Sequence, residues 1–188
     1  EWFLEELSDS IKASLTTRRE HGFHIGAFAP YGYKKDPNAR GHLVIDDEAA
    51  SVVRKIFSLY LEGRGKQVIA RSLNEEGIPN PTEYKRLHGI GRHKKAQCSP
   101  LWSYFTITNI LTNEVYIGNM VQGKSGVVSL KTQKKVPYPR EQWIVVPGTH
   151  EPIIDRDTWE STQNLIKQKS RKFSQYPEGI FAGMIRCL

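Results

Sequence analysis

The chain has 188 residues, and its 27 Lys or Arg against 20 Asp or Glu give a formal net charge of +7. Its four Trp, eight Tyr and seven Phe are enough to fill the core of one ordinary domain or two small ones, which excludes a disordered tail. No apolar run approaches the roughly 20 residues of a membrane-spanning helix, and the acidic start is not typical of a signal peptide, so we expect no membrane partner.

The first predicted element is a helix over residues 3–21. Its apolar side chains recur at helical spacing: Phe3, Leu4, Leu7, Ile11 and Leu15. Gly22 is a plausible C-terminal stop. Because the apolar stripe is narrow, we expect this helix to pack on a partner or on another domain. A turn is predicted at 30–33, where Pro30 presets its own φ and Gly32 tolerates a positive φ.

Residues 46–62 carry the clearest amphipathic pattern of the chain. Asp46 is a favourable N-cap, and Gly63 and Gly65 end the predicted helix. The apolar side chains of its buried face are Ala49, Val52, Val53, Ile56, Phe57 and Tyr60. A second helix, over 66–76, ends at Gly77. It is predicted to bury Val68, Ile69 and Leu73.

A basic loop is predicted over 82–98, and within it the segment 84–96 contains no acidic residue. A third helix of about 101–112 follows, with Ser99 as its N-cap and Pro100 at its first position. We expect Trp102 to anchor this helix in the core together with Ile107, Ile110 and Leu111. The side chains of Ser103, Tyr104, Thr106 and Asn109 are expected to point outward.

From residue 115 the pattern changes to β-structure. Three segments, 115–121, 127–130 and 143–146, predict a small antiparallel sheet. A second stretch without acidic residues, 118–140, spans this region and contains Lys124. Asp155 is a predicted cap for a last helix of about 156–170, after which 167–176 reads as a basic linker.

The acid-free basic stretches beside folded segments are typical of a protein that binds a polyanion, most often nucleic acid, although solvated loops are the alternative. Three consecutive helices joined by glycine turns suggest a helix-turn-helix unit, in which the last helix reaches base edges and basic side chains contact phosphates. From the residues we therefore expect these DNA contacts: Lys85, Arg86, Arg92, His93, Lys94, Lys95, Ser99, Ser103, Tyr104, Thr106 and Lys124.

Two other functions remain open at this point. An RNA-binding module would stack unpaired bases on Tyr116, Tyr138 and Trp143, although we expect these rings to cover the core face of the sheet instead. A protein-interaction domain would use the helix over 3–21. No nucleophile–base pair is evident in the sequence. The two cysteines, Cys98 and Cys187, are isolated, so they form no four-ligand metal site and no disulfide framework. This cysteine usage favours a cytoplasmic protein.

A series of short motifs, in order, resembles the recombinase domain of large serine recombinases. The resemblance covers about 22–166. It rests on Pro30-Tyr31-Gly32-Tyr33, Leu43-Val44-Ile45-Asp46, Val53-Arg54-Lys55-Ile56-Phe57, Ile69-Ala70, Gly77-Ile78-Pro79, Thr106-Ile107 and His150-Glu151-Pro152-Ile153-Ile154. It implies an α+β fold: a helix-turn-helix-like domain with a small antiparallel β-sheet and a long N-terminal linker helix.

The resemblance also implies a function. Such proteins are site-specific recombinases of bacteria, phages and transposons, which recognise double-stranded attachment-site DNA for integration or excision. Their catalytic serine belongs to an N-terminal domain that this sequence lacks, so no catalytic residue and no cofactor are expected here. Residues 1–21 would be the end of a linker helix through which subunits self-associate, and 22–166 the DNA-binding domain.

The last segment, 167–188, would be a basic linker followed by the start of a zinc ribbon. The resemblance implies that this linker contacts the DNA minor groove through Lys169, Arg171 and Lys172. It also implies that Cys187 is the first zinc ligand of the following ribbon, whose other ligands lie outside this sequence.

Overall fold

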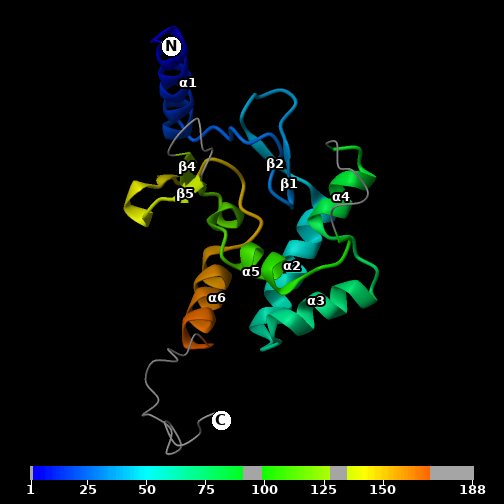
Figure 1. Ribbon diagram of the computed structural model, residues 1–188. Coiled ribbons are helices and arrows are strands. Elements are labelled where there is room, and N and C mark those ends of the chain that lie inside the picture. Colours follow the sequence, from blue (N-terminus) through cyan, green and yellow to red (C-terminus); the bar gives the residue numbers. More distant parts are fainter. Residues whose placement is uncertain (1, 91–98, 128–134, 170–188) are drawn as a thin grey trace, which may run out of the picture.

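The computed structural model describes residues 2–90, 99–127 and 135–169 (Figure 1). Helix α1 (Trp2–Glu20) confirms the first predicted helix. Gly22 ends it with a φ of 76°, and the N–H of Phe23 donates to the carbonyl of Arg18 at 3.1 Å. Leu7 and Ile11, in the middle of the apolar stripe of α1, are 48% and 53% exposed, so the described part of the chain leaves these two side chains uncovered.

A two-stranded antiparallel hairpin follows, formed by β1 (Tyr33–Lys35) and β2 (Leu43–Ile45) with Tyr33 opposite Ile45. The turn predicted before it is confirmed, because the N–H of Tyr33 donates to the carbonyl of Pro30 at 3.0 Å and Gly32 has a φ of 92°. The hairpin lies beside the helical core, into which Tyr33 and Leu43 are buried.

Three helices form the centre of the fold: α2 (Asp47–Leu61), α3 (Lys66–Glu75) and α5 (Tyr104–Leu111). Their fully buried side chains include Val53, Ile56, Phe57, Ile69, Leu73, Ile107 and Leu111. The prediction that Val68 is buried was wrong, since its side chain is 52% exposed. The buried stripe of α3 runs through Ile69, Ala70 and Leu73, and Val68 is turned about 100° away from Ile69.

The basic loop predicted over 82–98 begins instead as a helix, α4 (Pro81–Leu87). Asn80 is its N-cap, because the side-chain Oδ1 accepts the N–H of Thr82 at 3.0 Å and of Glu83 at 2.9 Å. Pro81 occupies the first helical position, where its missing N–H costs nothing. Residues 91–98 lie outside the described part of the chain.

Helix α5 begins three residues later than the predicted 101, and its N-cap is Ser103 rather than Ser99. The segment before it is held in a non-helical conformation by two asparagines. Asn80 Nδ2 donates to the carbonyl of Leu101 at 2.9 Å, and Asn74 Oδ1 accepts the N–H of Trp102 at 2.8 Å. Trp102 is buried as predicted, with its indole N–H donating to the carbonyl of Ile78 at 2.9 Å.

The β-rich region contains antiparallel strand pairs rather than one sheet. Strand β3 (Met120–Gln122) pairs with β6 (Ile144–Val146), and β4 (Ser125–Val127) pairs with β5 (Lys135–Pro137). Two short 3₁₀ helices flank them, η1 (Glu114–Ile117) and η2 (Arg140–Gln142), so the predicted strand over 115–121 is helical in its first part. Within η1, Tyr116 is buried and cannot stack on an unpaired base.

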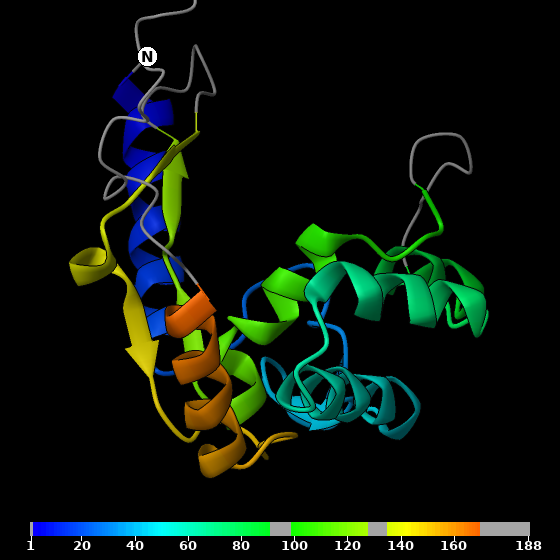
Figure 2. The same cartoon turned by 90° about the horizontal axis from the view of Figure 1, so that it is seen from below.

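The last described helix is α6 (Arg156–Lys169), which confirms the final helix prediction to within one residue. Asp155 caps it, with Oδ2 accepting the N–H of Thr158 at 2.8 Å. Trp159 packs against Phe57, their ring centroids 6.1 Å apart, and this contact fixes α6 to α2. Figure 2 shows α1 and α6 on one side of the molecule and α3 and α4 on the other.

The predicted α+β class is therefore confirmed. A buried hydroxyl connects the hairpin to the β-rich region: the Tyr33 hydroxyl accepts the N–H of Ile153 at 3.2 Å and donates to the carbonyl of Glu151 at 2.9 Å. The expected start of a zinc ribbon lies outside the described residues.

Candidate nucleic-acid interface

The start of α5 is stabilised by two residues that the sequence had suggested as base contacts. Ser103 Oγ accepts the N–H of Thr106 at 3.3 Å, and the hydroxyls of Ser103 and Thr106 are hydrogen-bonded at 3.0 Å. Both side chains are therefore already engaged in the N-cap. Ser103 is exposed, whereas Thr106 is half-buried.

The outward face of α5 consists of different side chains. Phe105 is 76% exposed and Tyr104 is 47% exposed, with the two rings edge to face at 5.8 Å between centroids. One and two turns further along, Asn109 and Thr112 are also exposed. The prediction that Tyr104 points outward is confirmed. Phe105 was missed, because a phenylalanine beside a buried tryptophan reads as core in a sequence.

Two lysines approach this face from neighbouring helices. Lys66, at the start of α3, places its Nζ 5.4 Å from the centroid of the Tyr104 ring. Lys169, at the end of α6, places its Nζ 5.0 Å from the centroid of the Tyr60 ring and 3.4 Å from the carbonyl oxygen of Gly63. Burial, with a smaller contribution from Tyr104, raises the pKa of Tyr60. The structure thus brings Tyr104, Lys66 and Lys169 together around Gly63.

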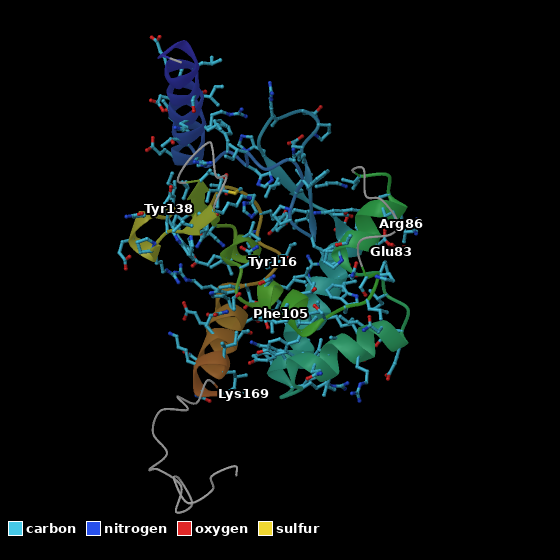
Figure 3. All side chains as sticks on the ribbon, in the orientation of Figure 1. Glu83, Arg86, Phe105, Tyr116, Tyr138 and Lys169 are labelled. Carbon is cyan, nitrogen blue, oxygen red and sulfur yellow. The ribbon has the colours of Figure 1, made fainter. Side chains whose placement is uncertain are left out.

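The cations of α4 are engaged within the protein. Arg86 forms a two-pronged ion pair with Glu83, with Nε to Oε2 at 2.8 Å, and this pair raises the pKa of Arg86. Lys85 lies half-buried with its Nζ 5.4 Å from the centroid of the Phe28 ring, and burial lowers the pKa of Lys85. Figure 3 shows Glu83 and Arg86 together on α4, at the opposite edge of the molecule from Lys169.

A second basic region lies where α1 meets β3. A hollow of about 350 Å³ there is lined by Arg19, His24 and Lys124 among others, and by no acidic residue. Arg19 Nε is buried without a hydrogen-bond partner among the described residues. Lys124 places its Nζ 5.3 Å from the centroid of the Trp143 ring. Sequence reasoning found Lys124 but missed Arg19, which reads as an ordinary outer position of a helix.

An adjoining hollow of about 410 Å³ is lined by three further cations, Arg18, Lys35 and Arg40, with Asp36 beside them. His24 borders both hollows, and burial is the main cause that lowers its pKa below the usual value. A neutral imidazole between guanidinium and ammonium groups adds no repulsion to them. These side chains come from α1, the hairpin and the β3–β4 connection, which only the fold brings together.

The remaining predicted residues divide into two groups. Ser99 is exposed, its Oγ accepts the N–H of Leu101 at 3.3 Å, and it lies before α5 rather than on it. The others lie outside the described residues: Arg92, His93, Lys94, Lys95, Arg171, Lys172 and Cys187. The described residues contain no cluster of three or more His, Cys, Asp or Glu suited to a metal ion. Over the same residues, no helix is long and apolar enough to cross a membrane.

Known proteins provide an independent comparison. A crystal structure of an LSR–DNA complex is 20% identical, with a TM-score of 0.48, over 85% of this chain and 38% of that one. A structure concerning the sequence requirements of the Listeria innocua prophage attP site is 21% identical, with a TM-score of 0.47, over 85% of this chain and 52% of that one. The chain thus spans about half or less of the length of these proteins. The family model named Recombinase matches residues 47–169, more than half of the sequence, and the chain therefore belongs to the Recombinase family.

Proposed function

We propose that this chain is the DNA-recognition part of a site-specific serine recombinase and binds double-stranded attachment-site DNA, with α5 facing base edges in the major groove. The observation that carries the proposal is the exposed face of α5. It has no charged side chain of its own, and Lys66 and Lys169 stand beside it on other helices. Neutral groups that read bases, flanked by cations that contact phosphates, are the arrangement that a duplex requires.

The hollow beside α1 supplies a second set of phosphate contacts. Arg19 has a buried Nε with a donor hydrogen that nothing in the described residues accepts, and Lys124 stands on the same rim. Charge-assisted hydrogen bonds from the guanidinium and ammonium groups of these two residues would hold a phosphate at that rim. The DNA backbone would then follow two basic regions, one around Gly63 and the other beside α1.

The remaining parts of the proposal concern the whole recombinase. A catalytic serine domain would precede α1, a zinc ribbon would begin at Cys187, and Lys169, Arg171 and Lys172 would contact the minor groove between the two DNA-binding modules. The exposed Leu7 and Ile11 support self-association through α1, because an uncovered apolar stripe on a helix is suited to a second helix. Sedimentation of the chain with and without residues 1–21 tests this last point.

The central experiment is selection of duplexes by the chain from a pool with a randomised core, followed by fluorescence anisotropy as salt is raised. We expect enrichment of a defined sequence, and a log affinity that falls with log salt by about 0.9 per neutralised phosphate. The double variant Arg19→Ala/Lys124→Ala should weaken every duplex alike and reduce that slope. Salt-insensitive binding, or stronger competition by single-stranded RNA than by duplex, would overturn the proposal.

A further inference from the structure

The hydroxyls on α5 are committed to the helix itself. Thr108 Oγ1 donates to the carbonyl of Tyr104 at 2.9 Å, and Thr112 Oγ1 donates to the carbonyl of Thr108 at 2.8 Å. Thr106 shares its hydroxyl with Ser103 at the N-cap. Thr108 and Thr112 therefore have no spare donor hydrogen for a base unless an existing bond is broken, whereas the Ser103–Thr106 pair keeps one.

Beside the exposed Tyr104, two further side chains of this face make no hydrogen bond within the helix. Phe105 and Asn109 are four residues apart, so they lie on the same face of the helix, and both are exposed. Asn109 has no hydrogen-bond partner among the described residues, so its amide N–H₂ and carbonyl oxygen are both available. Phe105 offers an apolar ring whose aromatic contact within the described chain is an edge-to-face contact with Tyr104.

This pair of groups matches one kind of base pair. In the major groove adenine presents the N7 acceptor beside the N6 donor, which a carboxamide meets with two hydrogen bonds, and thymine presents its C5 methyl, which an apolar side chain contacts. Guanine is read most often by Arg or Lys, and cytosine by Asp or Glu. Helix α5 contains none of these four residue types.

From this chemistry we infer that α5 selects A·T base pairs: Asn109 hydrogen-bonds adenine, and Phe105 contacts the methyl group of thymine in the same or the adjacent pair. The inference rests on the proposed function, because it requires α5 to face the major groove. It goes further, because it assigns base identity to two residues.

The charge around Phe105 favours a nucleic acid over a protein as its occupant. Two cations lie close to this face: Lys66, at 5.4 Å from the Tyr104 ring, and Lys169, whose Nζ is 3.4 Å from the Gly63 carbonyl oxygen. Each leaves its ammonium group at an aromatic ring or a carbonyl oxygen rather than in an ion pair. An apolar ring between such cations is suited to a groove whose edges are phosphates and whose floor carries methyl groups.

The test uses the whole chain and a duplex that it has itself selected. Each thymine is replaced in turn by uracil, which removes only the C5 methyl, and each adenine by 7-deazaadenine, which removes only the N7 acceptor. We expect the wild-type chain to lose about fourfold in affinity for the critical uracil. The loss should be about tenfold for the critical 7-deazaadenine.

Variants identify the residues responsible. Phe105→Ala should bind the thymine duplex more weakly than the wild type does, and should bind the thymine and uracil duplexes with equal affinity. Phe105→Leu should retain most of the loss of affinity that uracil causes in the wild type. Asn109→Ala should abolish the 7-deazaadenine penalty and leave the uracil penalty unchanged. Leu87→Ala removes another exposed apolar side chain, on α4, and serves as the matched control, with circular dichroism checking each fold.

The possible outcomes distinguish failure of this inference from failure of the proposed DNA-binding function. Tight, salt-dependent duplex binding that ignores both base analogues overturns the inference and leaves the proposed function standing. The inference also fails if Phe105→Ala retains the uracil penalty, or if this variant disrupts an assembly of the chain in sedimentation while leaving duplex affinity intact. Absence of salt-dependent duplex binding by the wild-type chain overturns both.

Discussion

Two basic regions of this molecule differ in whether their cations are already engaged by other protein groups. On α4, Arg86 is paired with Glu83, and Lys85 is half-buried against Phe28. Around Gly63, Lys66 and Lys169 lie beside aromatic rings and a carbonyl, next to the exposed face of α5. The first region is conspicuous in the sequence and internally neutralised. The second is inconspicuous in the sequence and available to an anion.

The difference teaches that a run of cations along a chain is not yet a binding surface. A phosphate must displace the existing partner of Arg86 and lift Lys85 from an apolar contact, and both steps reduce the net gain. Lys66 and Lys169 come from separate helices, and neither forms an ion pair with another described residue. The number of available charges is therefore set by the fold.

The largest effect is expected at Trp102, the buried anchor of the segment that precedes α5. Trp102→Ala removes a side chain that is 4% exposed, bonded to the carbonyl of Ile78, and packed edge to face on Tyr31. We expect it to destabilise the fold by about 3–5 kcal/mol in chemical denaturation. Leu101→Ala, one residue away on the surface, is the control and should change stability little. A loss at Trp102 below about 1 kcal/mol would contradict its role as the anchor of α5.

The comparison itself is tested by two matched double variants. Lys66→Ala/Lys169→Ala should make the salt dependence of duplex binding shallower by about 0.9 per lost phosphate contact, because free ammonium groups release counter-ions. Lys85→Ala/Arg86→Ala removes the same formal charge from α4 and should leave the slope almost unchanged. Anisotropy titrations at several salt concentrations measure both. Equal slopes for the two variants would remove the distinction between the regions.

A charge swap sharpens the same comparison. Glu83→Gln removes the carboxylate that neutralises Arg86, so the guanidinium becomes available to phosphate. We expect several-fold tighter duplex binding and a slope steeper by about 0.9. The double variant Glu83→Gln/Arg86→Ala should lose that gain. If it keeps the gain, the effect comes from removing negative charge in general and not from releasing Arg86.

The smallest effect concerns pH and the side of the molecule that carries the β-strand pairs. Burial is the main cause that lowers the pKa of His150, whose ring also bonds the carbonyl of Val115 at 2.7 Å. The unfolded chain therefore binds this proton more readily, so stability is full above pH 6.5 and declines as the pH falls through the lowered value.

Thermal unfolding measured over that pH range should show the decline in the wild type and a flatter profile in His150→Gln. Helix α5 contains no histidine, so base discrimination by the folded fraction should not follow the same curve. Parallel curves for stability and discrimination would mean that the two sides of the molecule are not separable in this way.

The elements with strong periodicity were predictable from the sequence. Helices α1, α2, α3 and α6 lie within two residues of their expected bounds, because apolar spacing and flanking glycines are local signals. Asp46 shows where local reasoning ends. It occupies the N-cap position of α2, yet its side chain makes no cap bond and instead accepts the hydroxyl of Tyr84 at 2.9 Å.

The candidate interface was less predictable, since it depends on contacts between distant segments. The late start of α5 requires Asn74 and Asn80 to hold the segment before Ser103, which is far from both in sequence. The late start also explains the exposure of Phe105. Trp102 lies before the helix, so the buried face of α5 is set by Ile107 and Leu111, and Phe105 lies on the opposite face. Lys66 can be recognised as part of the interface only because the fold places α3 beside α5, and Arg19 only because it places α1 beside β3.

The junction at Gly22 makes the direction of α1 a property of the whole domain. A methyl group at Gly22 would come within 2.6 Å of the Thr149 side chain and 3.1 Å of Val146, at the end of β6. Strand β6 also pairs with β3, which lines the hollow containing Arg19. A change in the direction of α1 would therefore move the end of β6, and through the β3–β6 pairing it would also move the residues that line the hollow. A load applied to the distant end of α1 would then alter the phosphate contacts proposed for this hollow.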